Sequence, residues 1–196
     1  MKPNADEVPP RGRPRWLRPT YYFSRVRDLS PQWLQSQGLA GLLVDLDSTL
    51  KPYRQATVAP ETAAWIRSLQ AAGIRLCIVS NGGGKRVAVT AEELGVPFLA
   101  RAWKPFPWRC RQGVRLLDVD PSAVAMVGDQ LFADIWAGYW AGIRTILIVP
   151  LAPEQEPFAT RWKRGLERWF LRRLGVIPGA GAEQSPHAPS PEARHD

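Results

Sequence analysis

Short apolar runs alternate with segments of helical periodicity along most of this chain. Five runs have the length and composition of buried strands: Leu42–Leu46, Ile74–Val79, Val96–Ala100, Ala123–Val127 and Thr145–Val149. Segments with the period of an α-helix lie between them, at Pro60–Ala72, Lys85–Leu94, Pro107–Leu117 and Leu131–Ala141. Strands that alternate with helices of this length form a parallel sheet that helices cover on both faces. The sequence therefore predicts a three-layer α/β fold with a parallel sheet of about five strands.

Polar side chains stand where four of these strands would end. They are Asp45, Asp47 and Thr49 at the first run, Ser80 and Asn81 after the second, Lys104 after the third, and Asp129 and Asp134 after the fourth. Because the carboxyl ends of parallel strands meet at one edge of the sheet, we expect these side chains to gather in one crevice.

Two of the acids are only two positions apart. In a strand, the side chains of Asp45 and Asp47 would lie on the same side. Carboxylates so close repel each other unless a cation neutralises them, and a hard ion such as Mg2+ prefers oxygen ligands. Acids, hydroxyls and the Lys104 cation in one crevice are what phosphoryl transfer requires.

These motifs resemble those of the haloacid dehalogenase (HAD) superfamily of phosphatases, subfamily IIIA. The resemblance rests on the sequence DLDST at 45–49, on Ser80, on Lys104 before a proline, and on GDQLFAD at 128–134. The chain is more closely similar to the YqeG-type subgroup, which includes phosphatidylglycerophosphate phosphatases; that likeness adds Thr160-Arg161 and Glu167-Arg168. Ser48, where Asn is common, and Ala133, where Thr is common, depart from the pattern. The resemblance implies a Rossmann-like HAD core.

The resemblance also implies a mechanism with two catalytic acids. Asp45 would attack phosphorus and form an aspartyl-phosphate, which splits one hard step into two. Asp47 would protonate the leaving group and then take a proton from the hydrolytic water. Lys104 would act with them by binding the transferring phosphoryl group.

The other motif residues would bind metal or substrate. The resemblance assigns Mg2+ to Asp45, to the backbone carbonyl of Asp47, to Asp129 and, at the metal or as a residue that orients Lys104, to Asp134. It assigns the substrate phosphate to Thr49, Ser80, Asn81 and Lys104. Ordinary readings exist too, since Asp134 could be a first-turn helix acid and Ser80 and Asn81 could be turn residues.

Two other interpretations are weaker. Gly82-Gly-Gly-Lys85-Arg86 lacks the GxxxxGK[ST] pattern of a phosphate-binding loop, so its two cations could meet substrate or simply be solvated. A phospho-accepting receiver module also uses acids, a hydroxyl and a lysine on a parallel sheet. The compact pair of Asp45 and Asp47 argues against a receiver, in which the acidic pair is far from the acceptor.

The intervals between motifs predict an open site. Only Lys51–Ala59 separates the first motif from the next helix, and Ser80–Lys104 has room for one helix and one strand. We therefore expect no large cap domain. In the HAD superfamily, this resembles enzymes that accept bulky substrates such as lipids, proteins or nucleic acids.

Basic and aromatic flanks favour an anionic lipid among those substrates. The formal net charge is +8, and Phe158–Val176 has the pattern of a basic, Trp-rich amphipathic helix that could bind a membrane or pack on the core. The aromatic residues before the first strand could extend that surface: Trp16, Tyr21, Tyr22, Phe23 and Trp33. Together with the resemblance to the YqeG-type subgroup, which implies phosphatidylglycerophosphate, these flanks make that lipid the preferred substrate; a soluble, protein or nucleic-acid phosphomonoester is the alternative.

The chain divides into four parts by composition. We expect a basic, Pro-rich tail at residues 1–19, the HAD core at 20–150, a basic amphipathic extension at 151–177 and a disordered tail at 178–196. No apolar stretch reaches the length of about 18 residues that spans a bilayer. We expect a cytoplasmic enzyme that binds peripherally to the membrane face.

Overall fold

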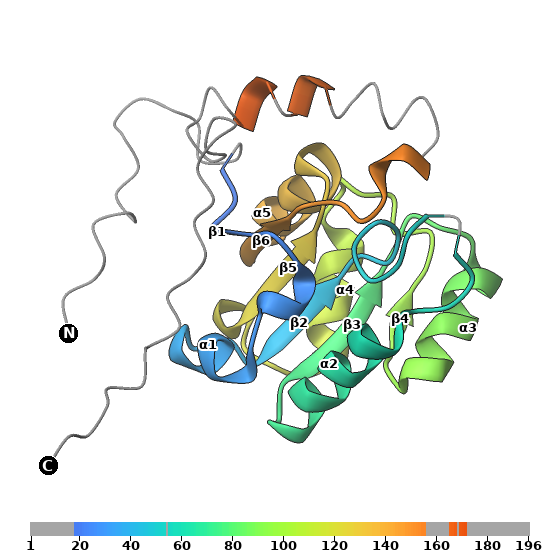
Figure 1. Ribbon diagram of the computed structural model, residues 1–196. Helices are drawn as coiled ribbons and strands as arrows, with labels where there is room; N and C mark the ends of the chain where they lie inside the picture. The colour runs from blue at the N-terminus through green and yellow to red at the C-terminus, as the bar shows by residue number, and fades with distance from the viewer. Residues whose placement is uncertain (1–17, 54, 156–164, 168, 172–196) are drawn as a thin grey trace, which may run out of the picture.

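Six parallel strands form a single sheet in the computed structural model, which describes residues 18–53, 55–155, 165–167 and 169–171 (Figure 1). The strand order is β1-β6-β5-β2-β3-β4. Their bounds are Tyr21–Phe23 for β1, Gly41–Val44 for β2, Arg75–Val79 for β3, Phe98–Leu99 for β4, Val124–Gly128 for β5 and Arg144–Ile148 for β6. The predicted α/β fold with its parallel sheet is confirmed.

The edge strand β1 was not predicted from the sequence. Tyr21 pairs with Ile146 and Phe23 with Ile148. The ring of Trp33 packs edge-on against both aromatic residues, with centroids 5.0 Å from Tyr21 and 4.7 Å from Phe23. Tyr21, Tyr22, Phe23 and Trp33 are half-buried at this sheet edge, and Trp16 lies outside the described residues, so a membrane-facing role for these aromatic residues stays a prediction. A strand of three residues is too short to show an alternating pattern.

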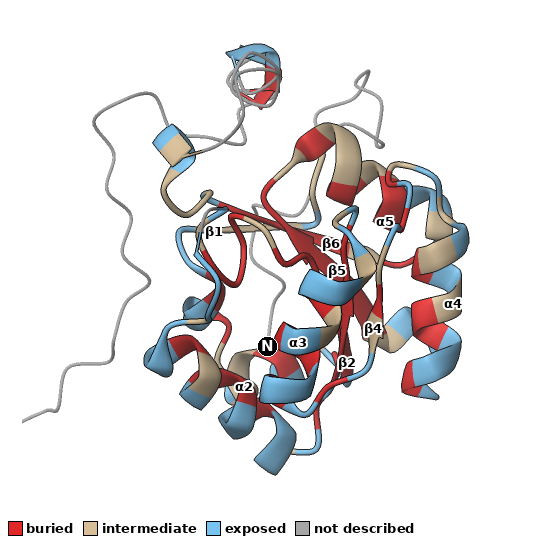
Figure 2. Cartoon of the chain, turned by 90° about the vertical axis from the view of Figure 1, so that its right-hand side faces the viewer, coloured by how far each residue is buried: buried red, intermediate tan, exposed pale blue. Residues whose placement is uncertain are grey.

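Helices cover both faces of the sheet, as the burial colouring in Figure 2 shows. One apolar core joins the sheet to α1 (Pro31–Ser36), α2 (Pro60–Ala71) and α3 (Gly84–Leu94). The other joins it to α4 (Trp108–Leu117) and α5 (Trp136–Ala141). Successive residues of β2 serve the two cores in turn: Leu42 and Val44 face the first, and Leu43 the second.

The strand order reverses beside β2, the first strand of the motif-bearing core. From β2 the chain builds outward through β3 and β4, then returns to place β5 on its other side. Counted from β2, the order is 3-2-1-4-5, the Rossmann order and not the 2-1-3-4-5 order of flavodoxin-like sheets. Ligands bind at such a reversal, outside the carboxyl ends of the strands. The ends of β2 and β5 therefore lie side by side where a site is expected.

Part of the predicted C-terminal helix packs against the folded α/β domain. Residues 165–167 and 169–171 are helical, and Leu171 is buried with Leu131, Ile135 and Leu147. The ring of Phe170 lies edge-on to that of Phe132, 5.7 Å between centroids. The remainder of Phe158–Val176, with Thr160, Arg161 and Arg168, lies outside the described residues, as do most of the two predicted tails. Among the described residues, no helix is both long and apolar enough to cross a bilayer.

We predict that the close approach of α5 to the sheet makes Gly138 intolerant of a side chain. A Cβ there would lie 2.7 Å from Thr145 Cγ2 and 2.8 Å from Met126 Cβ, whereas one at Gly84 would meet no atom within 4 Å. Overpacking of this kind costs about 1–3 kcal/mol. Urea unfolding should show this loss for Gly138→Ala and little or no loss for Gly84→Ala; equal stability of the two variants would contradict the packing.

Candidate active site

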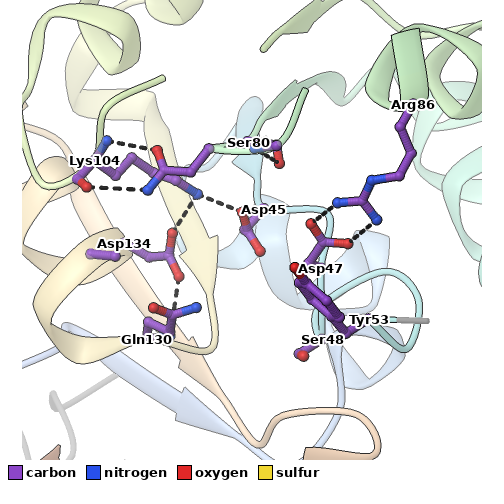
Figure 3. A pocket seen from close by; sticks show the side chains of 12 residues that line it. Asp45, Asp47, Ser48, Tyr53, Ser80, Arg86, Lys104, Gln130 and Asp134 are labelled. Carbon is purple, nitrogen blue, oxygen red and sulfur yellow. Dashed lines mark hydrogen bonds and ion pairs between the residues drawn. The ribbon is translucent and has the colours of Figure 1, made fainter. Parts of the chain in front are cut away.

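A pocket of about 200 Å3 opens at the carboxyl ends of β2, β3 and β5 (Figure 3). Six of the residues predicted from the sequence line it: Asp45, Asp47, Ser80, Asn81, Lys104 and Asp134. The other two predicted residues are buried, and the hydroxyl of Thr49 donates to Asp129 Oδ1 at 3.2 Å. The structure thus brings together side chains that come from four separate segments of the chain.

The buried Lys104 ammonium lies at the centre of the site. Its Nζ donates to Asp45 Oδ1 at 2.5 Å, to Asp134 Oδ1 at 2.6 Å and to the Val79 carbonyl at 2.8 Å. Burial alone would lower the pKa of Lys104, but the charges of Asp134 and Asp45 outweigh burial and hold that pKa above its ordinary value. Lys104 therefore stays cationic and fixes two acids from separate segments of the chain.

Asp45 is held in surroundings that disfavour its charge. Burial raises its pKa, the Lys104 ammonium lowers it, and the neighbouring Asp134 and Asp129 raise it again, so that the pKa of Asp45 lies well above its usual range. A second cation would relieve this repulsion. A bound metal ion would therefore stabilise the ionised form of Asp45, and the site also contains ligands for such an ion.

Three buried carboxylates could supply those ligands. Oxygen atoms of Asp45, Asp129 and Asp134 all lie within 4.8 Å of one another. An all-oxygen set suits Mg2+, and these residues fit the metal that the motifs predict. The Asp47 carboxylate is directed elsewhere, which is compatible with the prediction that Asp47 offers its backbone carbonyl.

Asp47 faces the mouth of the pocket, where Arg86 binds it. Arg86 Nη1 donates to Asp47 Oδ1 at 2.7 Å, and Nη2 donates to the other carboxylate oxygen (Figure 3). The hydrogen bonds that Arg86 donates to Asp47 raise the pKa of Arg86, and the guanidinium also lies 5.7 Å from the ring centroid of Tyr53. The sequence allowed two roles for Arg86, contact with substrate or an exposed position in solvent. In the structure Arg86 binds Asp47, a predicted catalytic acid.

Asn81 positions Lys104 through the backbone. Its Oδ1 accepts from Lys104 N at 2.8 Å, and its Nδ2 donates to the Lys104 carbonyl at 3.2 Å. Ser80 Oγ accepts from Gly82 N at 3.0 Å, so this hydroxyl retains a proton to donate into the pocket. Ser80 and Asn81 are therefore turn residues and also residues of the site.

Asp134 is built into the wall by close backbone packing. A Cβ on Gly128 would lie 2.2 Å from Asp134 Cγ, and Asp134 Oδ2 accepts from Gln130 N at 3.1 Å. Asp134 belongs to a π-helical turn, Leu131–Ile135, of the kind that often marks functional sites. The predicted continuous helix Leu131–Ala141 is thus divided, with regular α-helix only from Trp136.

A buried lysine that the sequence did not point to supports the mouth of the pocket. Lys51 is fully buried, and its Nζ donates to the Ala56 carbonyl at 2.7 Å and to Thr90 Oγ1 at 3.3 Å. Burial lowers the pKa of Lys51, and the charge of Arg86 adds to that effect. Lys51 ties the loop after β2 to α3, the helix that carries Arg86.

Comparison with known proteins agrees with this geometry. The family model of haloacid dehalogenase-like hydrolases matches residues 4–142. The chain belongs to this family. The probable phosphatase YqeG of Bacillus subtilis is 32% identical to this HAD hydrolase over 156 residues, which cover 80% of this chain and 90% of that protein.

A second relative is a longer plant protein. The chloroplastic/mitochondrial phosphatidylglycerophosphate phosphatase 1 of Arabidopsis thaliana is 29% identical over 157 residues, 76% of this chain and 45% of that protein. This chain thus spans less than half of that relative. Among solved structures, the cobalt-bound deoxy-D-mannose-octulosonate 8-phosphate phosphatase of Haemophilus influenzae matches with a TM-score of 0.49 and 15% identity, covering 71% of this chain and 91% of that one. The family and its phosphatase members identify this HAD hydrolase as a phosphatase, as the motifs predicted.

We predict that Lys104→Met destabilises the fold. The change leaves the buried carboxylates of Asp45 and Asp134 without their cation, and breaking a buried ion pair in this way costs roughly 3–5 kcal/mol. Urea unfolding in the presence of a chelator measures the loss. Lys85→Met, which removes an exposed lysine of α3, is the control, and a loss no larger than that of the control would contradict the pairing.

We predict that Asn81→Ala lowers kcat by about 100-fold, because misplacement of a catalytic group by about 1 Å has that effect. Asn81→Asp keeps the acceptor for Lys104 N and loses the donor, so its kcat should be intermediate. Steady-state kinetics with a soluble phosphomonoester measures both. Wild-type kcat in Asn81→Ala would show that Asn81 does not position Lys104.

Proposed function

We propose that this HAD phosphatase hydrolyses phosphomonoesters with Mg2+ through an aspartyl-phosphate, and that its substrate is phosphatidylglycerophosphate. The observation that carries the chemistry is the contrast between two nearby acids. Asp45 is buried against Lys104 beside two further carboxylates, whereas Asp47 lies at the pocket mouth against Arg86. Environments that separate two carboxyl groups in this way suit different roles for them.

The residues divide the reaction as follows. A carboxylate oxygen of Asp45 attacks phosphorus, and the bond from phosphorus to the leaving oxygen breaks while Lys104 neutralises charge on the phosphoryl oxygens. Asp47 would be released from its ion pair with Arg86 when that cation binds substrate phosphate, and in its protonated form it gives a proton to the leaving alkoxide, which yields the free alcohol. Water then attacks the aspartyl-phosphate and gives a proton to Asp47, which releases inorganic phosphate and regenerates Asp45.

Mg2+ held by Asp45, Asp129 and the Asp47 carbonyl would neutralise negative charge between nucleophile and phosphate. Asp134 would fix Lys104 at the same time, consistent with the distance of 2.6 Å between Asp134 Oδ1 and Lys104 Nζ. Ser80 would donate to a phosphoryl oxygen from the opposite wall. Thr49 would act indirectly, through its hydrogen bond to Asp129.

The lipid assignment rests on the mouth of the site and on the relatives. The described residues of the interval between β2 and α2 hold no inserted domain over the pocket, which supports access for a bulky molecule. Arg86 supplies positive charge where the leaving group would lie, which suits the second, diester phosphate of phosphatidylglycerophosphate. The plant relative is named for this substrate. A soluble, protein or nucleic-acid phosphomonoester is the alternative substrate class.

The nucleophile is tested by Asp45→Asn. We expect Mg2+-dependent turnover of a phosphomonoester to fall by at least about 1,000-fold, because the covalent route is lost. Asp118→Asn, at an acid whose side chain is 91% exposed, should keep wild-type turnover. Circular dichroism checks that both variants fold. Wild-type turnover in Asp45→Asn would remove Asp45 from the mechanism.

The substrate is tested by kcat/KM. Phosphatidylglycerophosphate in mixed micelles should be turned over more efficiently than soluble sugar, nucleotide or phosphopeptide monoesters. Higher kcat/KM for any soluble class would overturn the lipid assignment while leaving the phosphatase mechanism intact. Accumulation of a long-lived phosphorylated protein without turnover would instead indicate a receiver-like module.

A further inference from the structure

In the loop that carries Lys104, successive side chains point alternately inward and outward. Backbone hydrogen bonds fix it to the end of β3: Arg101 N donates to the Gly82 carbonyl at 3.1 Å, and Ala102 N to the Ser80 carbonyl at 2.9 Å. Ala102 and Lys104 point inward and are buried. Trp103, between them, is 69% exposed. The outer side of this loop is therefore rigidly attached to the catalytic site.

Three large aromatic side chains stand exposed on this loop and at the start of α4. Besides Trp103, they are Phe106 and Trp108, 51% and 52% exposed. The rings of Phe106 and Trp108 stack on each other, with centroids 4.5 Å apart and planes 8° apart. Trp103 also has a φ of 55°, a left-handed conformation that is uncommon for a bulky residue and accumulates at functional sites. Such a cluster marks an interaction surface.

The charge of the same segment has one sign. Between residues 101 and 117 the sequence contains no Asp or Glu, and apart from the buried Lys104 its cations are Arg101, Arg109, Arg111 and Arg115. Ion pairs in the described part of the chain are made by other cations, namely Arg75, Arg86 and Lys104. Arg109 and Arg111 donate to neutral acceptors, Gln112 Oε1 and the Trp140 carbonyl, so the positive charge of these arginines can still attract an anionic partner.

A second exposed aromatic pair adjoins α4. Arg111 Nη2 donates to the Trp140 carbonyl at 2.8 Å, and Trp140, 53% exposed, packs edge-on against Tyr139. Aromatic rings with an apolar body, set among arginines, suit the boundary between lipid headgroups and acyl chains. Basic residues near an anionic leaflet add electrostatic attraction.

We propose that this surface, formed by Trp103, Phe106, Trp108, Arg101 and Arg109 and called here the aromatic–arginine surface, docks the enzyme onto an anionic phospholipid bilayer. The proposal rests on the lipid substrate inferred above, because docking would serve to hold the pocket beside the phospholipid headgroups. It places membrane contact on the β4–α4 side. The C-terminal segment, which the sequence left open between membrane binding and core packing, packs Phe170 and Leu171 on the protein.

Matched tryptophan variants test the surface in the full-length protein. Trp108→Ala removes a ring that is 52% exposed and stacks on Phe106; Trp169→Ala removes one that is 51% exposed and packs on Phe170. Co-sedimentation with phosphatidylcholine vesicles, with and without phosphatidylglycerol, measures binding. We expect wild type and Trp169→Ala to bind only the anionic vesicles, and Trp108→Ala to bind them several-fold more weakly. Equal binding by both variants, or loss confined to Trp169→Ala, would overturn the proposal.

Charge removal gives a second measurement. Each basic residue near an anionic surface contributes about fivefold to binding, so Arg101→Gln combined with Arg109→Gln should weaken vesicle binding about 25-fold. Added salt should weaken the wild type in the same direction. Equal binding of the wild type to neutral and anionic vesicles would overturn the proposal. A concentration-dependent dimer that Trp108→Ala abolishes, without any vesicle binding, would also overturn it and would show that a second copy of the chain binds this surface.

Activity separates this inference from the proposed function. Trp108→Ala should keep wild-type turnover of a soluble phosphomonoester and lose turnover of vesicle-embedded phosphatidylglycerophosphate. Vesicle binding that depends on Trp108 without any lipid hydrolysis would overturn the substrate and support the surface. Lipid hydrolysis in micelles with no vesicle binding would overturn the surface and support the substrate.

Discussion

The buried Lys104 ammonium is the interaction on which the rest of the site depends. It joins Asp45, from the end of β2, to Asp134, from the π-helical turn after β5, and it also bonds the last carbonyl of β3. A lone ion in such a place would be costly, and the arrangement is stable only because opposite charges and hydrogen bonds meet it together. The sheet order is what allows this, since β5, β2 and β3 must be neighbours for the three partners to converge.

Asp45 and Asp47 illustrate how a strand end can separate two nearby acids. The period of a strand would place both carboxylates on one side, but β2 ends at Val44, before either acid, so that period does not govern them. Asp45 therefore meets Lys104 inside the protein, and Asp47 meets Arg86 at the pocket mouth. Ser48, the next residue, has a φ of 61°; Asn adopts this left-handed conformation readily, which is a physical reason for the Asn that the resemblance implies at this position.

The loop after β4 connects the chemistry to the outer surface. Its hydrogen bonds to Ser80, Asn81 and Gly82 hold it close to the pocket, and the alternation of its side chains sends Lys104 inward and Trp103 outward. A surface built on this loop is coupled to the nucleophile without any flexible linker. Positioning of the catalytic cation and presentation of an aromatic, basic surface are thus two consequences of one backbone conformation.

The sequence by itself determined the sheet, the motif residues and their common edge, because buried strands and amphipathic helices impose periods of two and about 3.6 residues. Only the tertiary structure decided which charges pair. Arg86 on Asp47, Asn81 on the Lys104 backbone and the buried Lys51 each depend on contacts between segments more than twenty residues apart or on a loop conformation that no local pattern encodes. The edge strand β1 was hidden for the related reason that three residues carry too little periodicity, and it is the pairing with β6 that makes Tyr21–Phe23 a strand.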